Sequence, residues 1–246
     1  MTSRVLALAV AGALLAPIVG LNRDPASRSP EVMLWAWERP VDLRGLSSVA
    51  GVAFLAQTIT VSDEAHVIAP RRQPLQVDSS TYLVAVTRVE APAGVPARRD
   101  LVAAIAADIA RTRTLPRVSA VQIDFDARAS QRAMYRQLLH DVRSALPPGT
   151  PLSMTALASW CLDDNWLDDL PVDEVVPMLF RMGPTEDMHR REFETRAAAP
   201  ACRAAVGLSL DEPAGIFVRR GKRLYMFNPG PWTPATVRAA GEEVRR

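Results

Sequence analysis

The chain has 246 residues, of which 48% are apolar and 23% are charged. That apolar content excludes a disordered chain, and only 12 glycines exclude a collagen-like fibre. The 29 basic and 27 acidic residues leave a net charge of +2, so the charge does not indicate a nucleic-acid-binding protein. The length is sufficient for one large domain or two small ones with a buried core.

The first 21 residues have the layout of a secretory signal. A single positive charge at Arg4 precedes an apolar run over residues 5–16, followed by Pro17 and small residues. The run is short for a membrane span, which needs about 20 apolar residues, but residues 18–21 extend it, so an uncleaved anchor is the alternative. We predict an exported protein, periplasmic or extracellular or anchored to the inner membrane by this segment, with a linker at residues 22–30.

Short apolar runs alternate with helical patterns over residues 31–246, which we interpret as a single domain. Strands are predicted at residues 32–37, 52–59, 82–89, 118–125, 152–160, 175–182, 205–210 and 224–228. Helices are predicted at residues 99–113, 130–146, 164–170 and 188–198, and after Thr233. The alternation implies a parallel sheet, and eight repeats imply a closed (β/α)8 TIM-like barrel. Residues 62–81 lack a helical period and predict a hairpin or extended loop, so we expect the barrel to be irregular or incomplete between its second and third strands.

The acidic side chains around the end of the fourth predicted strand are candidates for chemistry. Alternation along the strand directs Gln122, Asp124 and Asp126 toward the barrel axis. Two carboxylates placed in this way lie about 6 to 7 Å apart, and such proximity raises the pKa of at least one of them. The pair therefore suits general acid chemistry on a glycosidic oxygen. The alternative is structural, with arginines binding Asp124 inside the barrel and Asp126 capping the following helix.

Two further strand ends carry charged residues. Asp211 and Glu212 follow the seventh predicted strand, where they are candidates for a base or nucleophile, or else only form a turn. Arg181, near the end of the sixth, is directed inward, where it neutralises the aspartates or binds a sugar hydroxyl or carboxylate.

Tryptophans near strand ends are the second signal. Indole rings at a barrel mouth offer flat apolar faces for sugar rings, and the alternative is that they plug the barrel. We expect Trp35 to be core, and Trp37 with Glu38, Trp160 and Trp232 to be the candidates for substrate binding.

The two cysteines, Cys161 and Cys202, lie 41 residues apart. In an oxidising compartment they would form one disulfide worth about 4 kcal/mol, and the alternative is two buried thiols. The three histidines are scattered without metal-ligand spacing, and no glycine-rich phosphate loop is present. We predict no metal and no cofactor.

Four motifs carry a resemblance to a known family. They are VMLWAWERP at residues 32–40, QIDFDA with SQR at residues 122–127 and 130–132, TALASWC at residues 155–161, and VPMLFRMG at residues 176–183. On these motifs the chain resembles the bacterial domain of unknown function 3142 family over residues 31–232. The resemblance implies an exported bacterial protein with no assigned reaction.

A more distant likeness is to the family 18 glycoside hydrolases, which are barrels with alternating acids on the fourth strand. Asp126 matches the place of their general acid and Asp124 lies beside it, although Asp126 replaces a glutamate and Gln122 replaces an earlier acid. The MLFR segment at residues 178–181 resembles their Met-x-Tyr-Asp with both polar residues changed. Trp232 matches their sugar platform.

These features lead to two hypotheses about function. The first is an exported glycoside hydrolase-like barrel that acts on an envelope or extracellular polysaccharide by carboxylate general acid/base chemistry. The alternative is a non-catalytic carbohydrate-binding barrel, a lapsed hydrolase that assembles or senses a polysaccharide. Both have a polysaccharide or oligosaccharide as ligand.

Overall fold

The structure is a computed structural model that describes residues 30–45, 50–94, 98–162, 166–195, 198–212 and 222–243. The predicted leader at residues 1–21 and the linker up to residue 29 lie outside the described residues. Among the helices that are described, none has the length and apolar character needed to span a bilayer.

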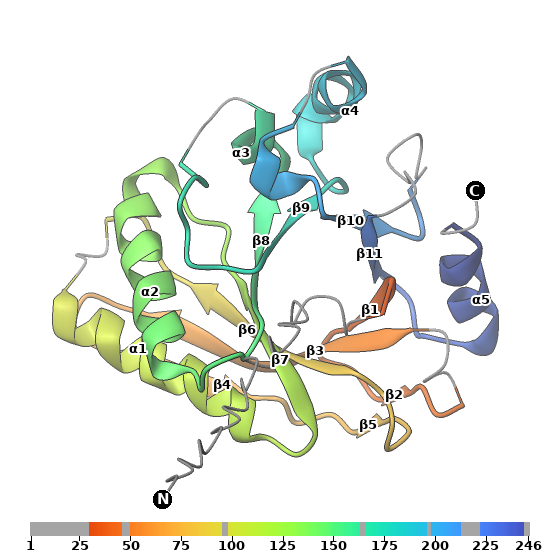
Figure 1. The fold of residues 1–246 in the computed structure, drawn as a ribbon, viewed down its shortest axis with the longest axis horizontal. Helices are drawn as coiled ribbons and strands as arrows, with labels where there is room; N and C mark the ends of the chain where they lie inside the picture. Colours follow the sequence, from red (N-terminus) through yellow and green to blue (C-terminus); the bar gives the residue numbers. More distant parts are fainter. Residues whose placement is uncertain are drawn as a thin grey trace, which may run out of the picture.

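Eight parallel strands form a closed barrel (Figure 1). In order around the barrel they are β1 (Val32–Ala36), β3 (Gly51–Val61), β6 (Leu83–Glu90), β7 (Val118–Asp124), β8 (Leu152–Leu157), β9 (Glu174–Met178), β10 (Ala205–Ser209) and β11 (Arg223–Phe227). The barrel closes because β1 pairs in parallel with both β3 and β11. All eight predicted strands are present, and the prediction of a (β/α)8 barrel is confirmed.

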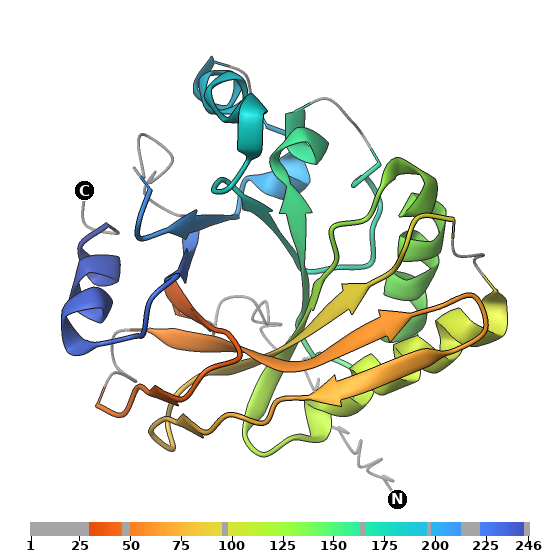
Figure 2. The same ribbon diagram turned by 180° about the vertical axis from the view of Figure 1, so that it is seen from behind.

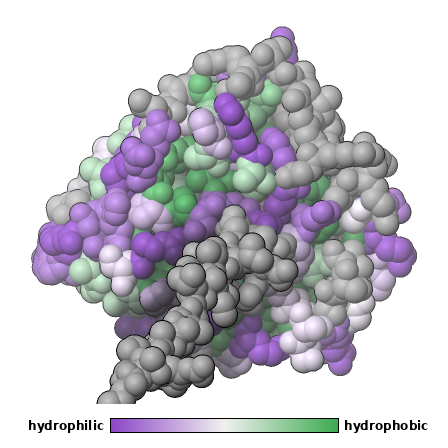
Figure 3. All heavy atoms as spheres, in the orientation of Figure 1, coloured by the Kyte–Doolittle hydropathy of each residue, from purple (hydrophilic) through white to green (hydrophobic). Residues whose placement is uncertain are grey.

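Helices follow several of the strands and lie outside the barrel (Figures 1 and 2). They are α1 (Arg99–Arg111), α2 (Arg132–Ala145), α3 (Ala158–Leu162), α4 (Glu186–Thr195) and α5 (Pro234–Glu243). Figure 1 shows α1 and α2 side by side, with α5 on the opposite side of the barrel. In Figure 3, hydrophilic residues predominate where α1 and α2 lie, with smaller apolar patches between them.

The two long helices form because each presents one apolar stripe to the sheet. In α1 this stripe includes Leu101, Ile105 and Ile109, and in α2 it includes Tyr135 and Leu139, all of them buried. They pack in one core cluster with the outward-facing side chains of β7, which are Val121 and Ile123 with Phe125 just beyond the strand. The alternation predicted for the fourth strand is therefore correct.

Three sequence predictions need correction at strand and helix boundaries. The fifth predicted strand ends at Leu157 rather than at residue 160, because residues 158–162 form α3. The sixth ends at Met178 rather than at residue 182, and the chain turns beyond it through positive φ angles at Arg181 and Gly183. Residues 166–169 of the helix expected at 164–170 form a turn, and residues 163–165 lie outside the described residues.

Residues 62–81 form the hairpin predicted between the second and third barrel strands, and no helix occurs within this fully described segment. Strand β4 (His66–Pro70) returns antiparallel to β3, and β5 (Leu75–Gln76) pairs with the short strand β2 (Val41–Asp42). His66 Nε2 lies 2.5 Å from Asp108 Oδ2 of α1, which ties the hairpin to that helix. The hairpin thus replaces the crossover helix of a regular barrel.

The barrel interior is filled around Trp35. Its ring lies so close to Gly207 of β10 that a Cβ at this position would be 2.8 Å from the Trp35 Cη2 atom. The indole Nε1 donates to Gln122 Oε1 at 2.9 Å, and Gln122 Nε2 donates to Ser153 Oγ at 3.1 Å. This layer closes the barrel as a packed core and forms the floor beneath the strand ends.

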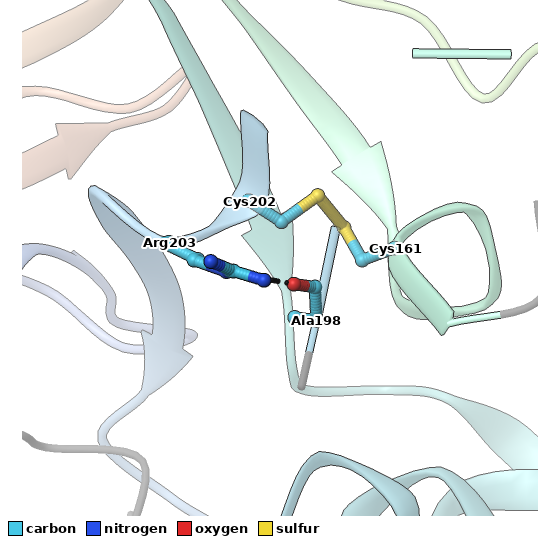
Figure 4. The surroundings of a disulfide bond; sticks show 4 residues. All are labelled: Cys161, Ala198, Cys202 and Arg203. Atoms are coloured by element: carbon cyan, nitrogen blue, oxygen red, sulfur yellow. Dashed lines mark hydrogen bonds between the residues drawn. A yellow bond between two sulfur atoms is a disulfide. The ribbon is translucent and has the colours of Figure 1, made fainter. Parts of the chain in front are cut away.

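Cys161 and Cys202 form a disulfide with a Cα–Cα distance of 6.0 Å, so the prediction of a bridge is confirmed (Figure 4). It joins α3 to the short 3-10 turn (Pro200–Cys202) that precedes β10. Beside it, Arg203 Nε donates to the carbonyl oxygen of Ala198 at 2.9 Å. The bridge therefore fixes the loop after β8 to the strand two positions further around the barrel.

Candidate functional site

A cavity of about 480 Å³ opens at the carboxyl ends of the barrel strands. It is lined by residues at or just beyond the ends of β1, β6, β7, β8, β9 and β11, together with residues near and in α4. This is the end of a (β/α)8 barrel where functional groups collect. Of the predicted site residues, Asp124, Asp126, Trp37 and Arg181 line the cavity.

One arginine holds the two aspartates on the cavity floor. Arg88 lies opposite Asp124 in the β6–β7 pairing. Its Nη1 donates to Asp124 Oδ2 at 2.7 Å and its Nη2 donates to Asp126 Oδ2 at 2.9 Å. Thr155 Oγ1 of β8 donates to the other oxygen of Asp124 at 2.7 Å. The structural alternative is thus correct in that an arginine binds Asp124, while Asp126 reaches the same guanidinium.

The two carboxylates differ in their exposure to solvent. The Asp124 side chain is 3% exposed and that of Asp126 is 42% exposed. Burial raises the pKa of Asp124, although the charge and hydrogen bond of Arg88 oppose this effect. Burial alone would lower the pKa of Arg88, but the two carboxylates outweigh it and raise that pKa. Asp124 therefore anchors the arginine from below, and Asp126 is the carboxylate that a ligand can reach.

Aromatic rings form a wall of the cavity. Phe180 and Phe227 are stacked, with their centroids 5.4 Å apart and their planes within 8° of each other. Trp37 meets Phe227 edge-on at 6.5 Å, and Trp35 lies 6.1 Å from Phe180. All four rings line the cavity. The apolar faces they present suit the faces of sugar rings.

Asp211 and Glu212 hold Arg181 at the cavity wall. Arg181 Nη2 donates to Asp211 Oδ2 at 2.9 Å, and the backbone nitrogen of Arg181 donates to Glu212 Oε1 at 3.2 Å. Glu212 also accepts from Arg190 Nη2 at 3.3 Å. A hydrogen bond from Ser209, with the charge and hydrogen bond of Arg181, lowers the pKa of Asp211. Neither acid is among the described residues that line the cavity.

The other four candidate site residues, Glu38, Gln122, Trp160 and Trp232, are not among the described residues that line the cavity. Glu38 Oε1 accepts from the backbone nitrogens of Arg72 and Gln73 at 3.1 and 3.2 Å, which ties β1 to the hairpin. Gln122 belongs to the interior layer described above. Trp160 is buried in the outer core with its ring 4.8 Å from Trp166. Trp232 donates its Nε1 to the carbonyl oxygen of Trp35 at 2.9 Å.

Arg88, Phe227 and His189 are among the lining residues that the sequence predictions do not name. Arg88 was detectable, because alternation along β6 with the inward-facing Val84 and Val86 puts it toward the axis. Phe227 was detectable in the same way, two residues after the interior Tyr225. His189 of α4 also lines the cavity and is 9% exposed, but it is isolated in the sequence and no pattern marks it. Within the described part of the chain, no group of three or more potential ligands suited to a metal occurs.

Comparisons with known proteins add little to this description. No family model matches the chain, and no curated protein matches it. Among solved structures, the chain is similar to the spore cortex-lytic enzyme SleL of Bacillus cereus, with 15% identity and a TM-score of 0.46 over 74% of this chain. It spans about half the length of that enzyme, 52%. The fold assignment therefore rests on the strand order, and the resemblance to the domain of unknown function 3142 family stays a prediction.

Proposed function

We propose that the protein binds a saccharide in this cavity and acts on it as a glycoside hydrolase-like enzyme. The observation that carries the proposal is a partly exposed carboxylate, Asp126, on the floor of a cavity walled by Trp37, Phe180 and Phe227. Aromatic faces bind the apolar faces of pyranose rings, and a carboxylic acid beneath them reaches a glycosidic oxygen.

In the proposed reaction, Asp126 acts as the general acid. Its carboxyl group gives a proton to the glycosidic oxygen as the bond between that oxygen and the anomeric carbon breaks. Water supplies the hydroxyl of the new reducing end, and the proton that this water loses goes to the base. Asp124 is a positioning residue, because it acts through Arg88 and not on the sugar. The base or nucleophile is assigned to Asp211 or Glu212, each of which would first have to leave its contact with Arg181.

A second candidate function is non-catalytic carbohydrate binding. One observation favours it. The carboxylates among the described lining residues are Asp124 and Asp126, which lie at the end of β7 and just beyond it, and both bind Arg88. A hydrolase with two carboxylates places them on opposite sides of the scissile bond, about 5 to 10 Å apart. Under this alternative the cavity holds a saccharide without cleaving it.

We also propose that the protein is exported. The disulfide between Cys161 and Cys202 supports this, because such bonds persist in oxidising compartments outside the cytosol. The N-terminal pattern at residues 1–21 is of the secretory type. An envelope or extracellular polysaccharide is the ligand that fits this location. Fractionation of cells that produce the full chain, with detection of the N-terminal residue of the exported form, tests both export and cleavage.

Glycan binding and reducing-end release, measured on the same panel of plant and envelope polysaccharides, separate the two functions. For a hydrolase, Asp126→Asn abolishes release, and Asp63→Asn, which changes an exposed acid of the hairpin, leaves it unchanged. For a binding protein, glycans are retained without release, and Trp37→Ala weakens their retention. If no glycan on the panel binds in a manner that depends on Trp37, both functions are excluded for that panel.

A further inference from the structure

A second cavity, of about 340 Å³, lies on the other side of Asp126. It is lined by residues from the ends of β3 and β6 and from the segment that leads from β7 into α2. Arg88 and Asp126 line both this cavity and the aromatic one. The two cavities therefore meet at the Arg88–Asp126 ion pair, which has an Nη2–Oδ2 distance of 2.9 Å.

Apart from the residues they share, the two cavities occupy different parts of the barrel mouth. The aromatic cavity extends from Asp126 toward β8, β9, β11 and β1, and includes Phe180 and Phe227. The second cavity extends toward β6 and β3, where Glu90 and Thr60 lie opposite each other in the strand pairing. Because Arg88 and Asp126 line both cavities, a ligand that passes from one to the other at this shared boundary crosses Asp126.

The linings differ in chemistry as well as in position. The second cavity has no aromatic ring among its described lining residues apart from Phe125, whose side chain is buried in the outer core. It offers instead the hydroxyl of Thr60, the carboxylate of Glu90 and the guanidinium of Arg128, all on exposed residues. Such groups hydrogen-bond to hydroxyls rather than stack on ring faces.

The base of the second cavity is held in place by its own hydrogen bonds. Gln131 is 4% exposed, and its Nε2 donates to the carbonyl oxygens of Ala91 and Pro92 at 3.1 and 3.0 Å. Its Oε1 accepts from the backbone nitrogen of Arg128 at 2.9 Å. Gln131 therefore fixes the position of the Arg128 backbone relative to the end of β6.

We propose that this second cavity is a polar saccharide subsite, and that one polysaccharide chain occupies both cavities and crosses Asp126. The inference rests on the proposed function and deepens it. The ligand is an internal stretch of a hydroxyl-rich polymer, with stacked units on the aromatic side and hydrogen-bonded units on the polar side. In a hydrolase this arrangement puts an internal glycosidic bond above Asp126, so that cleavage is of the endo type and not from a chain end.

The test compares short and long ligands in calorimetric titrations of the full chain. The probes are cellobiose and cellohexaose, xylobiose and xylohexaose, and chitobiose and chitohexaose. A hexasaccharide fills both cavities and a disaccharide fills the aromatic one. Arg128→Ala and, independently, Thr60→Val weaken binding of the hexasaccharide about three- to ten-fold, the effect of one lost hydrogen bond, and leave the disaccharide unchanged. Trp37→Ala weakens both ligands, and Arg72→Ala, an exposed arginine outside both cavities, weakens neither.

Two results overturn the inference in distinguishable ways. If Trp37→Ala weakens a hexasaccharide but neither Arg128→Ala nor Thr60→Val does, the ligand stays in the aromatic cavity and the second subsite is refuted alone. If no probe binds in a manner that depends on Trp37, the proposed function fails and this inference fails with it.

Discussion

Replacement of Arg88 by leucine tests the charge arrangement on the cavity floor. In the native protein Arg88 is the cation that both Asp124 and Asp126 contact. Leucine keeps part of the side-chain volume and removes the charge. Among the described residues, only Thr155 then still donates a hydrogen bond to the Asp124 carboxylate, whose side chain is 3% exposed. The variant therefore buries an uncompensated negative charge.

The magnitude follows from the cost of breaking a buried ion pair. Removal of one partner of such a pair costs about 3–5 kcal/mol in the free energy of unfolding. This loss of unfolding free energy becomes larger as the pH rises. Burial raises the pKa of Asp124, so its contribution to stability is present below the ordinary carboxylate pKa and is lost as pH rises through the folded-state value. Without the cation of Arg88, that folded-state pKa rises further, and the loss continues over a wider pH range.

Denaturant unfolding at neutral pH and near pH 4, close to the ordinary pKa of an aspartate, measures this effect. We expect Arg88→Leu to be strongly destabilised at neutral pH and much less at the acidic value. Asp124→Asn added to Arg88→Leu restores part of the stability, because it removes the buried charge. The matched control is Arg98→Leu, which breaks an exposed pair with Asp100 and costs about 0–1 kcal/mol. Equal destabilisation of Arg88→Leu at both pH values, or no recovery in the double variant, would refute the reasoning.

Two further predictions concern the scaffold. The double variant Cys161→Ala, Cys202→Ala loses about 4 kcal/mol in the free energy of unfolding, because the disulfide closes a loop with a sequence separation of 41 residues. Chemical denaturation measures this loss, and equal stability of the oxidised and reduced native protein would contradict the prediction. Gly207→Ala lowers the free energy of unfolding by about 1–3 kcal/mol, because the added Cβ lies 2.8 Å from the Trp35 ring, which the barrel interior encloses. An unchanged thermal midpoint of unfolding would show instead that the Trp35 ring moves freely.

The strands were predictable from the sequence because each is a short, mostly apolar run bounded by turn and loop residues. Alternation along the strand correctly assigned the sides of β7, with Ile123 in the outer core and Asp124 at the cavity. It failed where the chain leaves the strand. Trp160 follows β8 by three residues, but the helix α3 begins at Ala158 and carries the indole into the outer core. A period of two has no meaning beyond the last residue of a strand.

Contacts between strands set the rest of the site, and these depend on register. The pairing of Arg88 with Asp124 requires that β6 and β7 be neighbours and that these two residues lie opposite each other. The alternation within one strand predicts the side on which Arg88 lies but not its height in the barrel. The position of His189 is even harder to predict from the sequence, because its place at the cavity depends on the turn after β9, where Arg181 has a φ of 54°. No local pattern of apolar residues encodes that turn.

The charge arrangement at the junction of the two cavities connects fold and proposed function. The guanidinium of Arg88 contacts the carboxylates of Asp124 and Asp126 and lies 3.9 Å from that of Glu90, so acidic groups outnumber the cation in this cluster. Because Asp124 is enclosed, Asp126 is the partner of Arg88 in the aromatic cavity that a ligand reaches. A neutral hydroxyl of a sugar can donate to that partner, whereas an anionic group would be repelled. The site therefore favours a neutral saccharide over an acidic one at Asp126, and Asp126→Asn should reduce that discrimination.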